Sequence, residues 1–245
     1  MTKNAFHFPE VKFAFQPIIN AVNGTIIAFE ALVRGPNNES PGTVLSQVST
    51  QDLFAFDEHL RVMAISAAAG LNLKCALNID LLPQSIETSE APLKSTIDAA
   101  KQFQIDPRQL TIEISETQFI GNISNCVENL NLFRGLGIRF AIDDFGCGYS
   151  GLNLLADFQP EIIKLHSALI RDVNSRGPRQ AIVRGILRTS RDLGIDVIAG
   201  GVENLDEYQW CFEEGIELFQ GPLFAKPEFE RFPSAYYPHV GDDDK

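Results

Sequence analysis

The chain has 245 residues, a formal net charge of −12 at pH 7, and ordinary globular fractions of hydrophobic (44%) and charged (21%) residues. No apolar run reaches the roughly 18 residues of a membrane span, so we expect no transmembrane helix. The first ten residues lack the apolar stretch of a signal peptide. The acidic balance argues against a nucleic-acid partner and suits a site that gathers divalent cations.

The four cysteines are scattered along the chain, without the CxxC spacing of a zinc site or redox motif. They are Cys75, Cys126, Cys147 and Cys211. We interpret them as reduced thiols, because a disulfide framework or a metal site would need regular spacing. This usage predicts a cytoplasmic location.

A hairpin opens the predicted fold. Residues 12–19 and 25–33 are apolar, and the five residues between them, NAVNG, contain the Asn-Gly pair typical of tight turns. Because five residues are too few for a parallel crossover, the first two strands are expected to be antiparallel.

Helical and strand patterns then alternate. We predict helices over 52–69, 91–103, 125–136, 179–193 and 205–214, and strands over 74–79, 110–114, 138–142, 161–164, 196–199 and 217–219. Gly137, Gly194 and Gly215 stand where a helix ends in a left-handed residue before the next strand. Eight strands in this length predict a modified α/β (β/α)₈ TIM-like barrel with one antiparallel strand, and a doubly wound open sheet is the alternative.

We predict one domain over residues 1–240. The last five residues, GDDDK, resemble part of a protease-cleavable tag and are expected to lie outside the fold.

Polar side chains follow most of the predicted strands. They are Glu30, Asn78, Asp80, Glu113, Glu116, Asp143, Asp144, Lys164, His166, Glu203 and Gln220. In a βα barrel these strand ends meet at one mouth. Crowded carboxylates need a cation among them, and Mg²⁺ or Mn²⁺ prefers oxygen ligands. Two ions bridged by Asp143 and Asp144 would suit displacement at phosphorus, with Lys164 on a water or a phosphate oxygen.

Two of these residues have plainer interpretations. We interpret Asp80 as a turn residue before Leu81 rather than a ligand. His166 is interpreted as a neutral histidine hydrogen-bonded at the start of a loop, and a metal ligand is the alternative.

Several segments resemble the EAL domain family in order and spacing. They are Glu30-Ala31-Leu32-Val33-Arg34, Gln16-Pro17-Ile18, Asn78, Glu113-Ile114-Ser115-Glu116, Asp143-Asp144-Phe145-Gly146, Lys164, Gly201-Val202-Glu203 and Gln220-Gly221-Pro222-Leu223-Phe224. The resemblance covers residues 10 to 230. It implies a bacterial signalling barrel that takes cyclic di-GMP, which active members hydrolyse to linear pGpG with two Mg²⁺ or Mn²⁺ ions.

The resemblance also implies roles for single residues. The first metal would be held by Glu30, Asn78, Glu113 and Asp143, and the second by Asp143 and Asp144. Lys164 would contact the attacking water, Gln220 would lie beside the metal-water shell, and Glu116 would steady the loop after the Asp-Asp pair. The dinucleotide would be bound by Gln16, Leu32, Arg34, Asp144 and Glu203. A homodimer through the segment from Asp144 to Leu155 is also implied, and a protein partner is possible.

Two departures bear on activity. Gly200 stands where active members carry a carboxylate that serves the second metal, and His166 replaces the usual Asp two residues after Lys164. We therefore predict a domain that binds cyclic di-GMP with little or no hydrolysis, weakened at the second ion. The alternatives are an active phosphodiesterase and a domain that only contacts proteins. Restoring the carboxylate with Gly200→Glu is expected to raise pGpG formation.

Overall fold

The computed structural model describes residues 8–86, 91–118, 123–148 and 151–238. The predicted tail over 241–245 lies outside the described residues. The strands are β1 (Lys12–Asn20), β2 (Thr25–Arg34), β3 (Ala76–Asp80), β4 (Leu110–Ser115), β5 (Arg139–Phe145), β6 (Ile162–Leu165), β7 (Asp196–Ala199), β8 (Leu218–Phe219) and β9 (Glu228–Phe229). The helices are α1 (Pro41–Leu45), α2 (Leu53–Gly70), α3 (Ala91–Gln102), α4 (Ile123–Arg134), α5 (Gly151–Phe158), α6 (Ser167–Ile170), α7 (Gly177–Leu193) and α8 (Leu205–Glu213).

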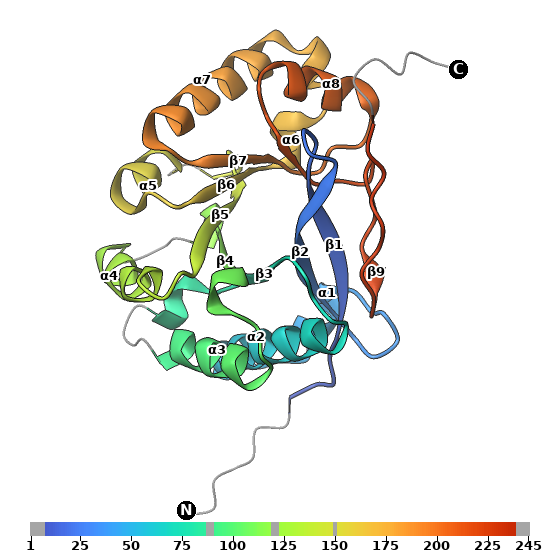
Figure 1. Ribbon diagram of the computed structural model, residues 1–245. Coiled ribbons are helices and arrows are strands. Elements are labelled where there is room, and N and C mark those ends of the chain that lie inside the picture. Colours follow the sequence, from blue (N-terminus) through green and yellow to red (C-terminus); the bar gives the residue numbers. More distant parts are fainter. Residues whose placement is uncertain (1–7, 87–90, 119–122, 149–150, 239–245) are drawn as a thin grey trace, which may run out of the picture.

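The strands close into a barrel, which confirms the predicted fold class. Strands β2 to β8 follow one another in parallel, and β1 completes the barrel by pairing antiparallel with β2 and with β8. The helices lie around the outside (Figure 1). The additional strand β9 pairs antiparallel with β1 and was not predicted: it has only two residues and, unlike the equally short β8, does not follow a predicted helix-ending glycine.

The helix-ending glycines adopt the predicted backbone conformation. Gly137, Gly194 and Gly215 have φ angles of 88°, 70° and 92°. An L side chain rarely adopts this left-handed conformation, so glycine ends each helix at low cost and redirects the chain into the next strand.

Two apolar layers support the barrel mouth. The larger core lies between the strands and the helices. The smaller one is inside the barrel and contains Ile18, Ala28, Ala76, Ala141, Ile162 and Ile198. Since alternate residues of a strand point to the same face, Asn78 and Glu30 stand two positions beyond Ala76 and Ala28 and form the next layer toward the carboxyl ends. The polar side chains therefore lie directly above this apolar layer inside the barrel.

No disulfide bond joins the four cysteines in the part of the chain that the structure describes, and Cys126 and Cys211 are buried. Within the described part of the chain, no helix combines the length and the apolar character needed to cross a bilayer.

Candidate functional site

A buried lysine is at the centre of the barrel mouth. The Nζ atom of Lys164, on β6, lies 3.0 Å from Glu30 Oε2, 2.9 Å from Glu113 Oε2 and 3.1 Å from Asp143 Oδ1. These carboxylates come from β2, β4 and β5, so barrel closure joins residues separated by up to 134 positions in sequence. The structure thus brings together four of the predicted site residues.

Two amide side chains orient the carboxylates. Gln220 Nε2 donates a hydrogen bond of 2.5 Å to Glu30 Oε2, and Asn78 Nδ2 donates one of 2.6 Å to Glu113 Oε1. The other atom of the Asn78 amide, Oδ1, is buried and has no hydrogen-bond partner in the described structure. A buried oxygen without a donor costs free energy, and a cation at this point would satisfy it.

Asp80 belongs to the same cluster, which corrects its interpretation as a turn residue. One carboxylate oxygen each from Glu30, Asp80, Glu113 and Asp143 lies within 4.8 Å of the others. Asp80 is the last residue of β3 and stands two positions after Asn78, so it faces the same side of the strand. The period-two spacing from Asn78 was the signal in the sequence that pointed to this position.

The charges in the cluster perturb one another strongly. Burial alone would lower the pKa of Lys164, but Asp143, Glu113 and Glu30 raise it well above its usual value. Burial raises the pKa of Glu113 well above its usual value, against the opposing charge of Lys164. Asp80 is exposed at the rim as a residue, yet desolvation of its carboxylate and the charges of Glu30 and Asp143 raise its pKa to about 8. Burial is thus the largest cause of the raised carboxyl pKa values, and the crowded negative charges add to it for Asp80 and raise the pKa of Lys164.

The donor set fits a hard divalent cation. Four carboxylates and one amide oxygen are available, and the single ammonium of Lys164 balances only one negative charge. Carboxylate and amide oxygens are the ligands that Mg²⁺ and Mn²⁺ take in proteins.

Asp144 and His166 lie side by side at the edge of this cluster. Asp144 has a φ of 55°, a left-handed conformation unusual for a residue with a side chain, and its Oδ1 is 3.9 Å from His166 Nε2. His166 Nδ1 accepts a hydrogen bond of 3.2 Å from the Ala168 backbone N–H and caps α6. This contact agrees with the interpretation of His166 as a hydrogen-bonded loop residue.

Glu116 lies beneath the loop that follows the Asp-Asp pair. Its Oε2 accepts hydrogen bonds of 2.7 Å from Gly146 N and 3.1 Å from Gly148 N. The contact puts Glu116 where the resemblance expects it, and its contribution to activity stays a prediction.

A cleft of about 540 Å³ opens from the cluster, and Leu32 lines it together with Asp80, Glu113, Asp143 and Asp144. Arg34 ends β2, and its Nη1 donates a hydrogen bond of 2.8 Å to the Val33 carbonyl oxygen. No carboxylate pairs with Arg34 within the described ranges, and burial lowers the pKa of its guanidinium. The guanidinium is therefore available to an anion.

The remaining predicted ligand-binding residues have other contacts. Gln16, opposite Glu30 in the β1–β2 register, donates 3.0 Å to the Ala225 carbonyl oxygen. Glu203 is exposed and pairs with Arg171, rather than with a member of the cluster.

Position 200 has no room for a side chain. A Cβ atom on Gly200 would lie 2.7 Å from the Leu165 carbonyl oxygen and 3.3 Å from Lys164 Cγ. The Gly200 N–H already donates 3.1 Å to that carbonyl, which fixes β6 against β7. This geometry argues against the expected rescue by Gly200→Glu, because the added Cβ would force backbone apart.

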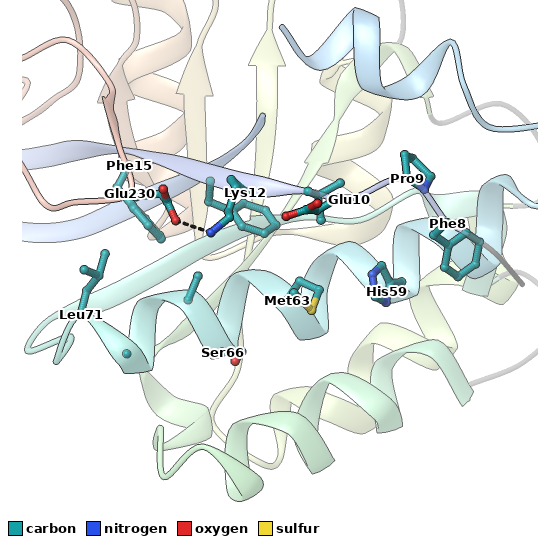
Figure 2. A pocket seen from close by; sticks show the side chains of 14 residues that line it. Phe8, Pro9, Glu10, Lys12, Phe15, His59, Met63, Ser66, Leu71 and Glu230 are labelled. Atoms are coloured by element: carbon teal, nitrogen blue, oxygen red, sulfur yellow. Dashed lines mark hydrogen bonds and ion pairs between the residues drawn. The ribbon is translucent and has the colours of Figure 1, made fainter. Parts of the chain in front are cut away.

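A second hollow, of about 620 Å³, lies outside the barrel between the start of β1 and α2 (Figure 2). Phe8, His59 and Met63 line it, and Lys12 Nζ pairs with Glu230 Oε1 at 2.7 Å. This surface ion pair is unlike the crowded carboxylates of the mouth, so we place the chemistry at the mouth.

Comparisons with known proteins identify what the chain is similar to. A standalone EAL protein from Vibrio cholerae O395, solved in a form bound to c-di-GMP, is 41% identical with a TM-score of 0.90, over 95% of this chain and 98% of that one. BlrP1 from Klebsiella pneumoniae, solved as a manganese and cy-diGMP complex, is 38% identical with a TM-score of 0.86, over 90% and 56%. The blue light- and temperature-regulated antirepressor BluF of Escherichia coli is 35% identical, over 92% of this chain.

This chain spans 56% of the length of BluF. The family model for the EAL domain matches residues 1–227. The chain belongs to the EAL domain family.

Proposed function

We propose that this domain binds cyclic di-GMP at the barrel mouth with the help of a divalent cation and hydrolyses it slowly or not at all. Two relatives that are 41% and 38% identical were solved with this dinucleotide, and one of those structures also contains manganese. The cleft of about 540 Å³ and the unpaired Arg34 guanidinium suit a phosphodiester ligand.

Each polar group would have a defined task in binding. The ion would be held by Glu30, Asn78, Glu113 and Asp143, and when bound it would supply positive charge to a phosphate oxygen. Lys164 holds three of the carboxylates in place through contacts of 2.9 to 3.1 Å. Arg34 would form a charge-assisted hydrogen bond to the ligand phosphate.

The observation that carries low turnover is Gly200. The β7 side of the mouth presents no carboxylate at this position, and the Leu165 carbonyl oxygen would have to move to accept a side chain there. Asp143 and Asp144 alone would hold a second ion weakly. General acid–base help is worth about 10²- to 10⁴-fold in rate, so its loss would leave binding intact and turnover slow.

An active phosphodiesterase is the second candidate. It is favoured by the complete set of Glu30, Asn78, Glu113, Asp143 and Lys164 at one mouth. A domain that only contacts proteins is the third candidate. Such a function does not account for the Asn78 oxygen without a hydrogen-bond partner or for the Arg34 guanidinium without a carboxylate partner in the described part of the chain.

Calorimetric titration with cyclic di-GMP in the presence and absence of Mn²⁺, read together with pGpG production, separates these candidates. The proposal predicts Mn²⁺-dependent binding and little product. Turnover of about 1 s⁻¹ or more would identify an enzyme. No binding in either condition would leave protein contact as the function.

The expected homodimer remains part of the proposal. Leu152 on α5 and Ile182 on α7 are exposed apolar residues that line one hollow of about 620 Å³. Sedimentation of wild type and Leu152→Glu tests this contact, and a monomeric wild type would contradict it.

A further inference from the structure

Asp80 has no assigned task in the site, although its position is well defined. It ends β3 and lies opposite Glu113 in the β3–β4 register, while Asn78 two residues earlier lies opposite Glu30 on β2. Asp80 therefore stands at the inner rim of the barrel, directly above the layer that contains Asn78.

Asp80 is also the member of the cluster that forms no ion pair with Lys164 among the residues described. The Lys164 ammonium pairs with Glu30, Glu113 and Asp143. No ion pair or hydrogen bond of the Asp80 side chain occurs within the residues described. Yet one of its oxygens lies within 4.8 Å of a carboxylate oxygen of each of the other three acids. A charge in this position repels its neighbours unless a cation joins them.

A second observation points to a bound cation at the same place. Asn78 is 1% exposed, its Nδ2 is committed to Glu113, and its Oδ1 has no partner in the described structure. Asn78 and Asp80 share one face of β3, so the unpartnered oxygen and the unpaired carboxylate belong to the same side of the cluster.

The opposite side of the mouth lacks a carboxylate where β7 ends. Gly200 provides no side chain, and an added Cβ would lie 2.7 Å from the Leu165 carbonyl oxygen, so the backbone would have to shift to accept one. The negative charge available to an ion is thus displaced toward β3.

We infer that Asp80 is a ligand of the divalent cation at this mouth and offsets the carboxylate missing at Gly200. The inference rests on the proposed metal-assisted site. With Asp80, four carboxylate oxygens lie within 4.8 Å of one another and could share one ion, and a larger number of charged ligands raises cation affinity.

Titration of the full chain with Mn²⁺ alone, without nucleotide, tests the inference. Asp80→Asn keeps the shape of the side chain and removes its charge, and it should raise the Mn²⁺ dissociation constant at least about 10-fold. The matched control is Asp196→Asn, an exposed acid at the start of β7, whose dissociation constant should equal that of wild type. An unchanged dissociation constant for Asp80→Asn would overturn the inference.

Thermal unfolding adds a readout that a purely structural role would not move. Loss of one charged ligand in Asp80→Asn should reduce the increase in melting temperature that Mn²⁺ produces. An Mn²⁺-dependent increase equal to that of wild type would again contradict the inference. If wild type binds no Mn²⁺, the metal-assisted function itself fails, and cyclic di-GMP titration then shows whether nucleotide binding survives.

Discussion

The two halves of the barrel mouth differ in charge. Strands β2 to β5 present four carboxylates, from Glu30, Asp80, Glu113 and Asp143. Strands β6 to β8 present the ammonium of Lys164, the bare backbone of Gly200 and the amide of Gln220. The carboxylates of β2 to β5 can therefore hold a cation. Lys164 balances part of their negative charge, and Gln220 orients Glu30. This asymmetry favours one well-held ion over two.

The largest expected effect comes from removing the positive charge of Lys164 on β6. Lys164→Met leaves the buried carboxylates without their ammonium, so we expect a loss of about 3–5 kcal/mol in the free energy of unfolding without metal. Urea denaturation measures it. The control is Lys12→Met, whose ammonium pairs with Glu230 at the surface and should contribute at most about 1 kcal/mol. If both variants lost the same free energy of unfolding, the buried Lys164 ion pairs would stabilise the fold no more than a surface ion pair does.

The next effect comes from the carboxylate half. Glu113 is 1% exposed and contacts both Asn78 and Lys164. Glu113→Gln removes one charged ligand and is expected to weaken Mn²⁺ binding about 100-fold or more, as measured by calorimetry. Glu203→Gln, which alters a surface ion pair, should bind Mn²⁺ like wild type. If Glu113→Gln bound Mn²⁺ with the same dissociation constant as wild type, the ion would not bind at this cluster.

Arg34, at the end of β2, tests whether a ligand phosphate is bound beside the cleft. Arg34→Ala should weaken cyclic di-GMP binding by about 1.5–3 kcal/mol, the range of a charge-assisted hydrogen bond, and should leave Mn²⁺ binding unchanged. Calorimetric titrations with each ligand separate the two effects. A dissociation constant for cyclic di-GMP that stays at the wild-type value would place Arg34 outside the site.

The smallest expected effect concerns Gly200, directly after β7, where an added side chain would contact the Leu165 carbonyl oxygen. Gly200→Ala introduces a Cβ at 2.7 Å from the Leu165 carbonyl, so we expect a loss of about 1–3 kcal/mol in unfolding free energy. Gly200→Glu adds the same atom and should lose stability instead of gaining turnover. Gly70→Ala is the control, since no atom lies within 4 Å of its added Cβ. A Gly200→Ala protein as stable as wild type would show that β6 and β7 separate easily.

Most of the fold could be predicted from local signals. The Asn-Gly turn identified the hairpin, and the glycines that end helices marked the βα joints, because both depend on a few adjacent residues. The short elements β9, α1 and α6 were missed, because two to five residues carry little periodicity; β8 is as short as β9 but was recognised from the helix-ending glycine before it.

The site was predicted less completely. The rule that strand ends meet at one mouth identified Glu30, Glu113, Asp143 and Lys164. The same rule reached Asp80, but we interpreted it as a turn residue, because a residue at the end of a strand can begin a turn or face the barrel and only the β3–β4 pairing decides between them. The closure of position 200 depends on the spacing of β6 and β7, which no local pattern encodes.

A single-turnover experiment tests the central claim most directly. The protein, in excess over cyclic di-GMP and saturated with Mn²⁺, is incubated and its bound nucleotide is then identified by chromatography. Binding with little hydrolysis predicts that the retained nucleotide is intact cyclic di-GMP after many times the turnover interval of an ordinary enzyme. Conversion of the bound nucleotide to pGpG within about a second would contradict the account and identify an active phosphodiesterase.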